Sequence, residues 1–302
     1  MNCRTALIYL LLTSTWSLAA PKGQLKIHVV DHESGAPIAG AEAKVTSFMG
    51  GDAWNGIELG TANGRTDGNG WVTIEFEGEM SIAAGAKHPG YYKNGKAVDL
   101  HKRAGKWLPW GKEVEIRLRL QKNPVPMHLV SCSELLPVQD EPVGFDLVMA
   151  DWVAPHGAGQ DSDFIFVWNH GYQAPQTYNS ELTVTFANPH DGIVDAGDAL
   201  VERMLIFEAP TDGYEPSRYV FNRPAGRNKQ RELSFDEHRA SVFRVRTQME
   251  GDTLAGMYGC LVSDFMLASS PEGNGRIHFS YLLNPDRTRN LEWNGKNLFR
   301  QR

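Results

Sequence analysis

Between Glu113 and Leu120, apolar and charged side chains alternate without a break. Successive side chains of a β-strand point to opposite faces of a sheet, so this pattern predicts a strand with one buried face and one solvent-exposed face. A sheet of this kind must bury its apolar face against a second layer. The alternating residues are Val114, Ile116, Leu118 and Leu120 on one face, and Glu113, Glu115, Arg117 and Arg119 on the other.

The same period of two recurs in short segments along the whole chain. Leu25–Val29 and Val72–Phe76 show it in the first half, and Leu182–Phe186 and Ile277–Tyr281 show it in the second. Only one short helix is expected, from Asp198 to Phe207. Short strands separated by turn residues are typical of sandwiches and jelly rolls. The sequence therefore predicts a mainly β chain with two β-sandwich domains, the second being a sandwich or a jelly roll.

The first domain also carries a recognisable arrangement of strands and turns. Ile27-His28-Val29-Val30-Asp31 precedes a Ser34-Gly35-Ala36-Pro37 corner, and Thr66-Asp67-Gly68-Asn69-Gly70 introduces the strand at Trp71. This pattern resembles the carboxypeptidase regulatory-like (prealbumin-like) β-sandwich family. The resemblance implies a scaffold module without catalytic residues of its own. More loosely, Asp151–Gly157 and Tyr281–Pro285 are similar to an uncharacterised family of secreted bacterial proteins.

Residues 1–20 have the composition of a secretory signal peptide. Arg4 supplies a positive charge, Ala6–Leu12 form a short apolar run, and Ser17-Leu18-Ala19 places small residues before the expected cleavage point. The apolar run is too short to span a bilayer. We therefore expect an exported chain, periplasmic or extracellular, with no membrane span after cleavage.

Two prolines mark the expected domain boundary. The segment Asn123-Pro124-Val125-Pro126 is expected to be a stiff linker. It would separate a β-sandwich at residues 24–122 from a β-rich domain at residues 127–302.

Charge and cysteine content restrict the partners. The formal net charge is −6, which argues against a nucleic-acid partner because such a protein needs a strong basic surface. Once the expected signal peptide is removed, Cys132 and Cys260 are the cysteines that remain. Two cysteines in an oxidising compartment can form one disulfide. Two separate buried thiols are the alternative.

A basic and aromatic insertion, Tyr91–Lys112, interrupts the first domain and is a candidate binding site. Tryptophan offers a broad apolar surface for stacking on sugar rings, and clustered cations attract polyanions. We therefore expect a polysaccharide with sulfate or uronate groups as a ligand. Alternatively, the two tryptophans pack on the edge of the sandwich. The candidate residues are Lys102, Arg103, Lys106, Trp107 and Trp110.

The densest polar cluster of the second domain contains Asp151, His156, Asp161 and Asp163. Carboxylates favour Ca²⁺, whereas a histidine favours Zn²⁺. The alternative is that these carboxylates cap turns through local hydrogen bonds to the backbone. The sequence contains none of the usual short catalytic motifs, such as a Gly-x-Ser-x-Gly elbow or a His-Glu-x-x-His pair.

These observations predict an exported, non-catalytic scaffold or binding protein. Its expected partner is a polysaccharide or another envelope protein. The alternative is a secreted metal-dependent hydrolase that uses the cluster around Asp151 and Asp163.

Overall fold

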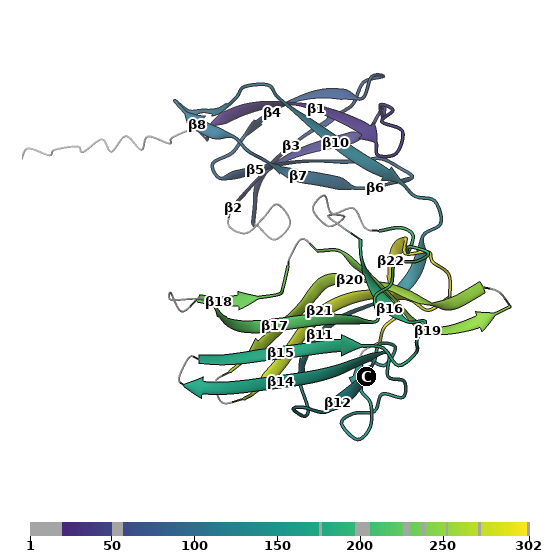
Figure 1. The fold of residues 1–302 in the computed structure, drawn as a ribbon. Helices are drawn as coiled ribbons and strands as arrows, with labels where there is room; N and C mark the ends of the chain where they lie inside the picture. Colours follow the sequence, from purple (N-terminus) through teal and green to yellow (C-terminus); the bar gives the residue numbers. More distant parts are fainter. Residues whose placement is uncertain are drawn as a thin grey trace, which may run out of the picture. The chain divides into compact units, whose positions relative to one another are not determined.

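The computed structural model describes residues 20–49, 57–174, 177–196, 206–225, 230–236, 239–251, 253–270 and 273–300. Contacts divide the chain into two compact units, Met1–Gln121 and Lys122–Arg302. Every regular element in the described ranges is a strand (Figure 1), so the predicted mainly β fold is confirmed. Nearly all of the expected signal peptide and most of the expected helix at Asp198–Phe207 lie outside these ranges. Within them, no helix is long and apolar enough to cross a membrane.

The first unit is a sandwich of two sheets. In the larger sheet, the central strand β1 (Lys22–Asp31) pairs in parallel with β10 (Lys112–Leu120) and antiparallel with β4 (Trp71–Glu77). Three short strands complete this sheet: β6 (Tyr91–Tyr92), β8 (His101–Arg103) and β9 (Lys106–Leu108). The smaller sheet has the order β3 (Ile57–Arg65), β2 (Glu42–Met49), β5 (Ser81–Lys87) and β7 (Asn94–Val98).

The alternation that the sequence shows in β10 decides which side chains enter this core. Val114, Ile116 and Leu118 are at most 5% exposed and pack into the first unit's apolar cluster. The glutamates between them face the solvent. Leu120 departs from the prediction, since it is 42% exposed at the end of the strand.

The second unit is also a sandwich of two sheets. One sheet has the order β16 (Gly192–Asp195), β19 (Ser241–Glu250), β20 (Thr253–Ser269), β21 (Gly275–Asn284), β11 (Val125–Leu135) and β22 (Trp293–Asn297). The other has the order β13 (Asp151–Trp152), β12 (Pro142–Asp146), β14 (Phe164–Ala174), β15 (Thr177–Thr185), β17 (Ser217–Ala225) and β18 (Gln230–Leu233).

Val125 and Pro126, which the sequence places in a linker, begin strand β11. Val125 donates its backbone N–H to the carbonyl of Glu292 and pairs with Trp293 of β22. These two residues therefore belong to the second unit.

Aromatic side chains from both sheets fill the core of the second unit. The Phe164 ring lies 5.2 to 6.1 Å from five other phenylalanine rings, mostly edge to face, which is a favourable arrangement of aromatic quadrupoles. Its neighbours are Phe166, Phe186, Phe243, Phe265 and Phe279.

Candidate functional site

The predicted binding residues of the insertion lie on and just after a short hairpin, which we call the basic hairpin (residues 101–108). Strands β8 and β9 pair so that Lys102 lies opposite Trp107 and Arg103 opposite Lys106. Ala104 and Gly105 form the turn, both with positive φ (50° and 71°), which suits a two-residue hairpin. Lys102, Arg103 and Lys106 are all exposed. The turn therefore presents three cations to the solvent.

Trp107 anchors the hairpin and is not free to stack on a ligand. Its side chain is 6% exposed within the first unit's core, and its Nε1–H donates to the carbonyl of Gly78 at 2.8 Å. The Lys102 ammonium lies 4.8 Å from the centroid of the Trp107 ring, within the range of a cation–π contact. The expected stacking of a sugar on Trp107 is thus incompatible with its position, whereas its alternative role at the edge of the sandwich is observed.

Trp110 follows the hairpin and remains accessible. It is 42% exposed, and the Lys106 ammonium lies 5.5 Å from its ring centroid. Four of the five candidate residues, Lys102, Arg103, Lys106 and Trp110, are thus exposed. A cavity of 790 Å³ adjoins the hairpin and is lined partly by Phe48, Met80, Lys102 and Trp107.

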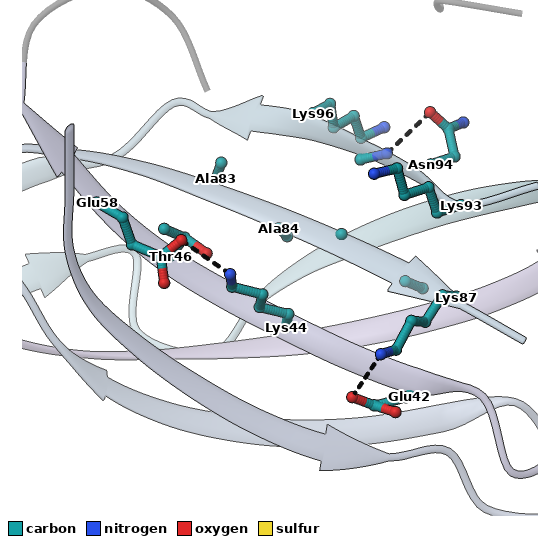
Figure 2. Close-up of a pocket in the computed structure, with 13 residues that line it drawn as sticks. Glu42, Lys44, Thr46, Glu58, Ala83, Ala84, Lys87, Lys93, Asn94 and Lys96 are labelled. Carbon is teal, nitrogen blue, oxygen red and sulfur yellow. Dashed lines mark hydrogen bonds and ion pairs between the residues drawn. The ribbon is translucent and has the colours of Figure 1, made fainter. Parts of the chain in front are cut away.

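A second concave site, which we call the lysine groove, lies on the outward face of the β3-β2-β5-β7 sheet (Figure 2). Its volume is 330 Å³. Lys44 contacts Glu58 at 2.9 Å, and Lys87 contacts Glu42 at 3.2 Å. The groove is lined by Glu42, Lys44, Thr46, Glu58, Ala83, Ala84, Gly85, Ala86, Lys87, Lys93, Asn94, Gly95 and Lys96.

Sequence reasoning noticed Lys93 and Lys96 only as members of the insertion and missed the groove. Lys44 and Lys87 stand next to core residues in β2 and β5, and the alternation there shows only that they face outward. Recognising the groove required the pairing of β5 with β7, which the sequence does not indicate.

The four polar residues proposed as metal ligands have different contacts and do not form one site in the structure. Asp151 accepts the backbone N–H groups of Trp152 and Ala158, each at 2.8 Å, so it caps a turn. His156 is exposed in the turn that follows β13. Within the described ranges, no group of three or more His, Cys, Asp and Glu residues is arranged to hold a metal ion.

Asp161 and Asp163 instead contact Arg246, which the sequence analysis did not single out. Arg246 Nη1 lies 2.8 Å from Asp161 Oδ2, and Arg246 binds Asp163 through both Nε and Nη2. Arg246 Nη2 also lies 2.8 Å from Asp146 Oδ1. One guanidinium therefore meets three carboxylates, and two of these, Asp146 and Asp163, are at most 2% exposed.

Hydrogen bonds satisfy the rest of this network. Burial disfavours the charged form of Asp146, but backbone N–H groups of Gln160, Met149 and Asp161, together with the charge of Arg246, outweigh it and lower the pKa of Asp146. The backbone N–H of Leu147 donates to Asp163 at 2.9 Å. These carboxylates are already saturated with donors, which is the arrangement of a structural cluster.

Cys132 and Cys260 are free and buried. Cys132 on β11 pairs with Phe279, and Cys260 on β20 pairs with Leu282, so β21 runs between them. Phe279 and Leu282 are three residues apart in β21 and point to opposite faces. Cys132 accordingly packs in one apolar cluster and Cys260 in another. This geometry excludes the disulfide that was one of the two expectations.

The second unit has a cleft of 770 Å³ that Cys132 helps to line. His128 also lines it and is only partly buried. Burial lowers the pKa of His128, and its Nδ1 has no hydrogen-bond partner in the described part of the chain. Asp151 is the one predicted metal-site residue that contributes to this cleft.

Comparisons with known proteins identify no family. No protein-family model matches the chain, and no curated protein matches it. Among solved structures, it is similar to a shaft pilin from Lactobacillus rhamnosus GG, with 9% identity, 78% of this chain and 91% of the pilin covered, and a TM-score of 0.22. It is also similar to a protein described as membrane-associated and of unknown function from Bacteroides fragilis NCTC 9343. That match has 9% identity, covers 89% of this chain and 99% of the other, and has a TM-score of 0.19.

Proposed function

We propose that this chain is an exported, non-catalytic binding protein whose basic hairpin recognises an anionic polysaccharide. The observation that carries the proposal is the placement of Lys102, Arg103 and Lys106 on a turn that the buried Trp107 anchors. An anchored hairpin loses little conformational entropy when its cations meet a ligand, which favours binding. Export rests on the signal-like composition of residues 1–20.

The metal-dependent hydrolase is the weaker candidate. Asp161 and Asp163 contact Arg246, and Asp151 caps a turn, so a metal ion would have to displace contacts that the fold itself uses. A scaffold role is compatible with two sandwiches whose cores are built from side chains of both sheets.

Retention on a column of immobilised heparin tests the proposal. We expect the wild type to be retained and to elute with salt, because screening weakens contacts between exposed charges. Replacing Lys102, Arg103 and Lys106 together by glutamine should move elution to clearly lower salt.

A variant of equal charge provides the control. Arg65→Gln, Arg223→Gln and Lys296→Gln remove three exposed positive charges outside the hairpin, and this variant should elute close to the wild type. Equal losses in the two triple variants would show that only net charge matters and would reject the hairpin as the site. Trp110→Ala tests stacking separately, and weaker retention is expected because Lys106 loses its aromatic support.

A further inference from the structure

The lysine groove is a concavity separate from the basic hairpin, since none of the hairpin residues lines it. Its volume of 330 Å³ lies at the lower end of the range of about 300–1,000 Å³ that is typical of ligand pockets. A single unit the size of one sugar ring matches this space better than a larger ligand.

The floor of the groove is flat because its outward-facing residues are small. Ala83 and Gly85 of β5 lie opposite Ala97 and Gly95 of β7. A Cβ at position 95 would lie 2.7 Å from the Ala84 carbonyl oxygen and 2.9 Å from the Gly85 Cα. Only glycine at 95 therefore allows the two strands to approach this closely. A ligand can lie directly on the strands at this point.

The walls of the groove carry an excess of positive charge. Four lysines and two glutamates line it, although the chain as a whole has a net charge of −6. Both glutamates pair with lysines, Glu58 with Lys44 and Glu42 with Lys87. Within the part of the chain that the structure describes, Lys93 and Lys96 have no carboxylate at ion-pair distance. Both are exposed, and Figure 2 shows them on the β7 side of the groove.

We propose that the lysine groove binds a sugar-sized carboxylate, such as a uronate. The carboxylate lies against the Lys93 and Lys96 ammonium groups, where charge-assisted hydrogen bonds are strong. The apolar face of the ring lies on the floor at Ala83 and Gly85. This site does not depend on the hairpin, so a uronate can bind either as a free monosaccharide or as one unit of a polymer.

Titration of the full chain with glucuronate tests the proposal, with the backbone amide resonances of Gly85 and Gly95 as the readout. We expect saturable shifts for both glycines. The double variant Lys93→Gln with Lys96→Gln should raise the Kd about tenfold or more, because two contacts to a charged group are lost. The control variant, Lys22→Gln with Lys26→Gln, removes the same charge from β1 and should leave the Kd unchanged.

Two further measurements examine the ring and the floor. Glucose has a similar ring without the carboxylate, so its Kd should be at least about tenfold higher than that of glucuronate. Ala83→Leu fills the floor and keeps every lysine, so it should abolish the shifts. Glucose that binds as tightly as glucuronate, or an Ala83→Leu variant that binds normally, would overturn the proposal.

Lysines on an edge strand can also prevent pairing between copies of a protein. That role predicts that the Lys93→Gln, Lys96→Gln variant self-associates while its affinity for glucuronate stays unchanged, and this result would reject the groove as a ligand site.

A glucuronate oligomer distinguishes a free monosaccharide from a polymer as the source of the ligand, since a lower Kd for the oligomer than for the monomer identifies a polymer. The variant with Lys102, Arg103 and Lys106 replaced by glutamine should retain the glucuronate-induced shifts of the groove. Failure of the groove proposal can therefore be distinguished from failure of the hairpin proposal.

Discussion

Arg246 donates two parallel hydrogen bonds to the Asp163 carboxylate, from Nε to Oδ1 at 2.8 Å and from Nη2 to Oδ2 at 2.7 Å. This fork geometry is the strongest form of contact between a guanidinium and a carboxylate. Because the carboxylates of Asp146 and Asp163 are buried, the cation opposite them cannot be removed without a large cost.

Replacing Arg246 by methionine should therefore destabilise the second unit by about 3–5 kcal/mol, the usual effect of breaking a buried ion pair from one side. Native-state hydrogen exchange at the Leu147 amide, which donates to Asp163, measures the change. The control is Arg223→Met, which breaks an exposed pair with Glu232 and should cost at most about 1 kcal/mol. Similar effects of the two substitutions would contradict a structural role for the Arg246 cluster.

The stability of the second unit should depend on pH through His128. Burial lowers the pKa of this imidazole in the folded chain, so below about pH 6.5 the unfolded chain binds more protons than the folded chain. Stability is then full above that pH and falls as the pH drops towards the folded pKa. The slope stays below about 1.4 kcal/mol per pH unit, and solvent reduces it further because the ring is only partly buried.

Urea unfolding between pH 5 and pH 8 measures this slope. The variant His128→Phe keeps an aromatic ring and removes the titrating group, so its stability should change less over the same interval. A slope that is identical in the variant would assign the pH dependence to other groups.

Truncation of Trp107 should destabilise the first unit far more than truncation of Trp110. Trp107→Ala removes a buried ring and leaves the Gly78 carbonyl without its donor, so we expect a loss of about 3–5 kcal/mol in the first unit. Trp110→Ala removes an exposed ring and should change stability by no more than about 0.5 kcal/mol. Thermal unfolding of both variants checks this contrast, which would fail if the two melting temperatures fell by equal amounts.

Gly95→Ala should destabilise the first unit by about 1–3 kcal/mol, because the added methyl group meets the backbone of β5. Gly68→Ala is the matched control, since a Cβ at that position meets nothing within 4 Å. Urea denaturation of the two variants provides the comparison. A neutral effect at position 95 would show that β5 and β7 can separate without cost.

Both cysteines of the second unit should resist modification in the folded chain. Burial raises the pKa of the Cys132 and Cys260 thiols to about 12, so little thiolate forms at neutral pH. Alkylation with iodoacetamide should be negligible under native conditions. In denaturant without a reductant, both residues should react, as peptide mass mapping can show. A combined mass for the Cys132 and Cys260 peptides that disappears when a reductant is added would indicate that they pair.

The sequence predicted those features that depend on local alternation. The strand at Lys112–Leu120 and the mainly β composition follow from the period of two, which needs no knowledge of partners. The composition of the Tyr91–Lys112 insertion drew attention to Lys102 and Arg103 but could not show that Trp107 points inward. Its burial depends on contact with Gly78, 29 residues earlier.

Long-range pairing accounts for the predictions that failed. Asp161 and Asp163 looked available for a metal because their cation, Arg246, lies more than 80 residues later. Cys132 and Cys260 looked able to pair because the sequence does not reveal that β21 separates them. The groove likewise exists only once β7 has paired with β5.

The Arg246 cluster also sets an order of events for a chain that is made from its N-terminus. Asp146 precedes Arg246 by 100 positions, and the Arg246 backbone N–H binds Asp191, 55 positions earlier. Closing loops of this length lowers the conformational entropy of the chain before the resulting contacts can stabilise it. Topologies rich in such long-range contacts therefore fold slowly. The second unit cannot complete its interior until residue 246 has been synthesised. This half of the protein therefore acquires its complete interior only after most of its residues have been made.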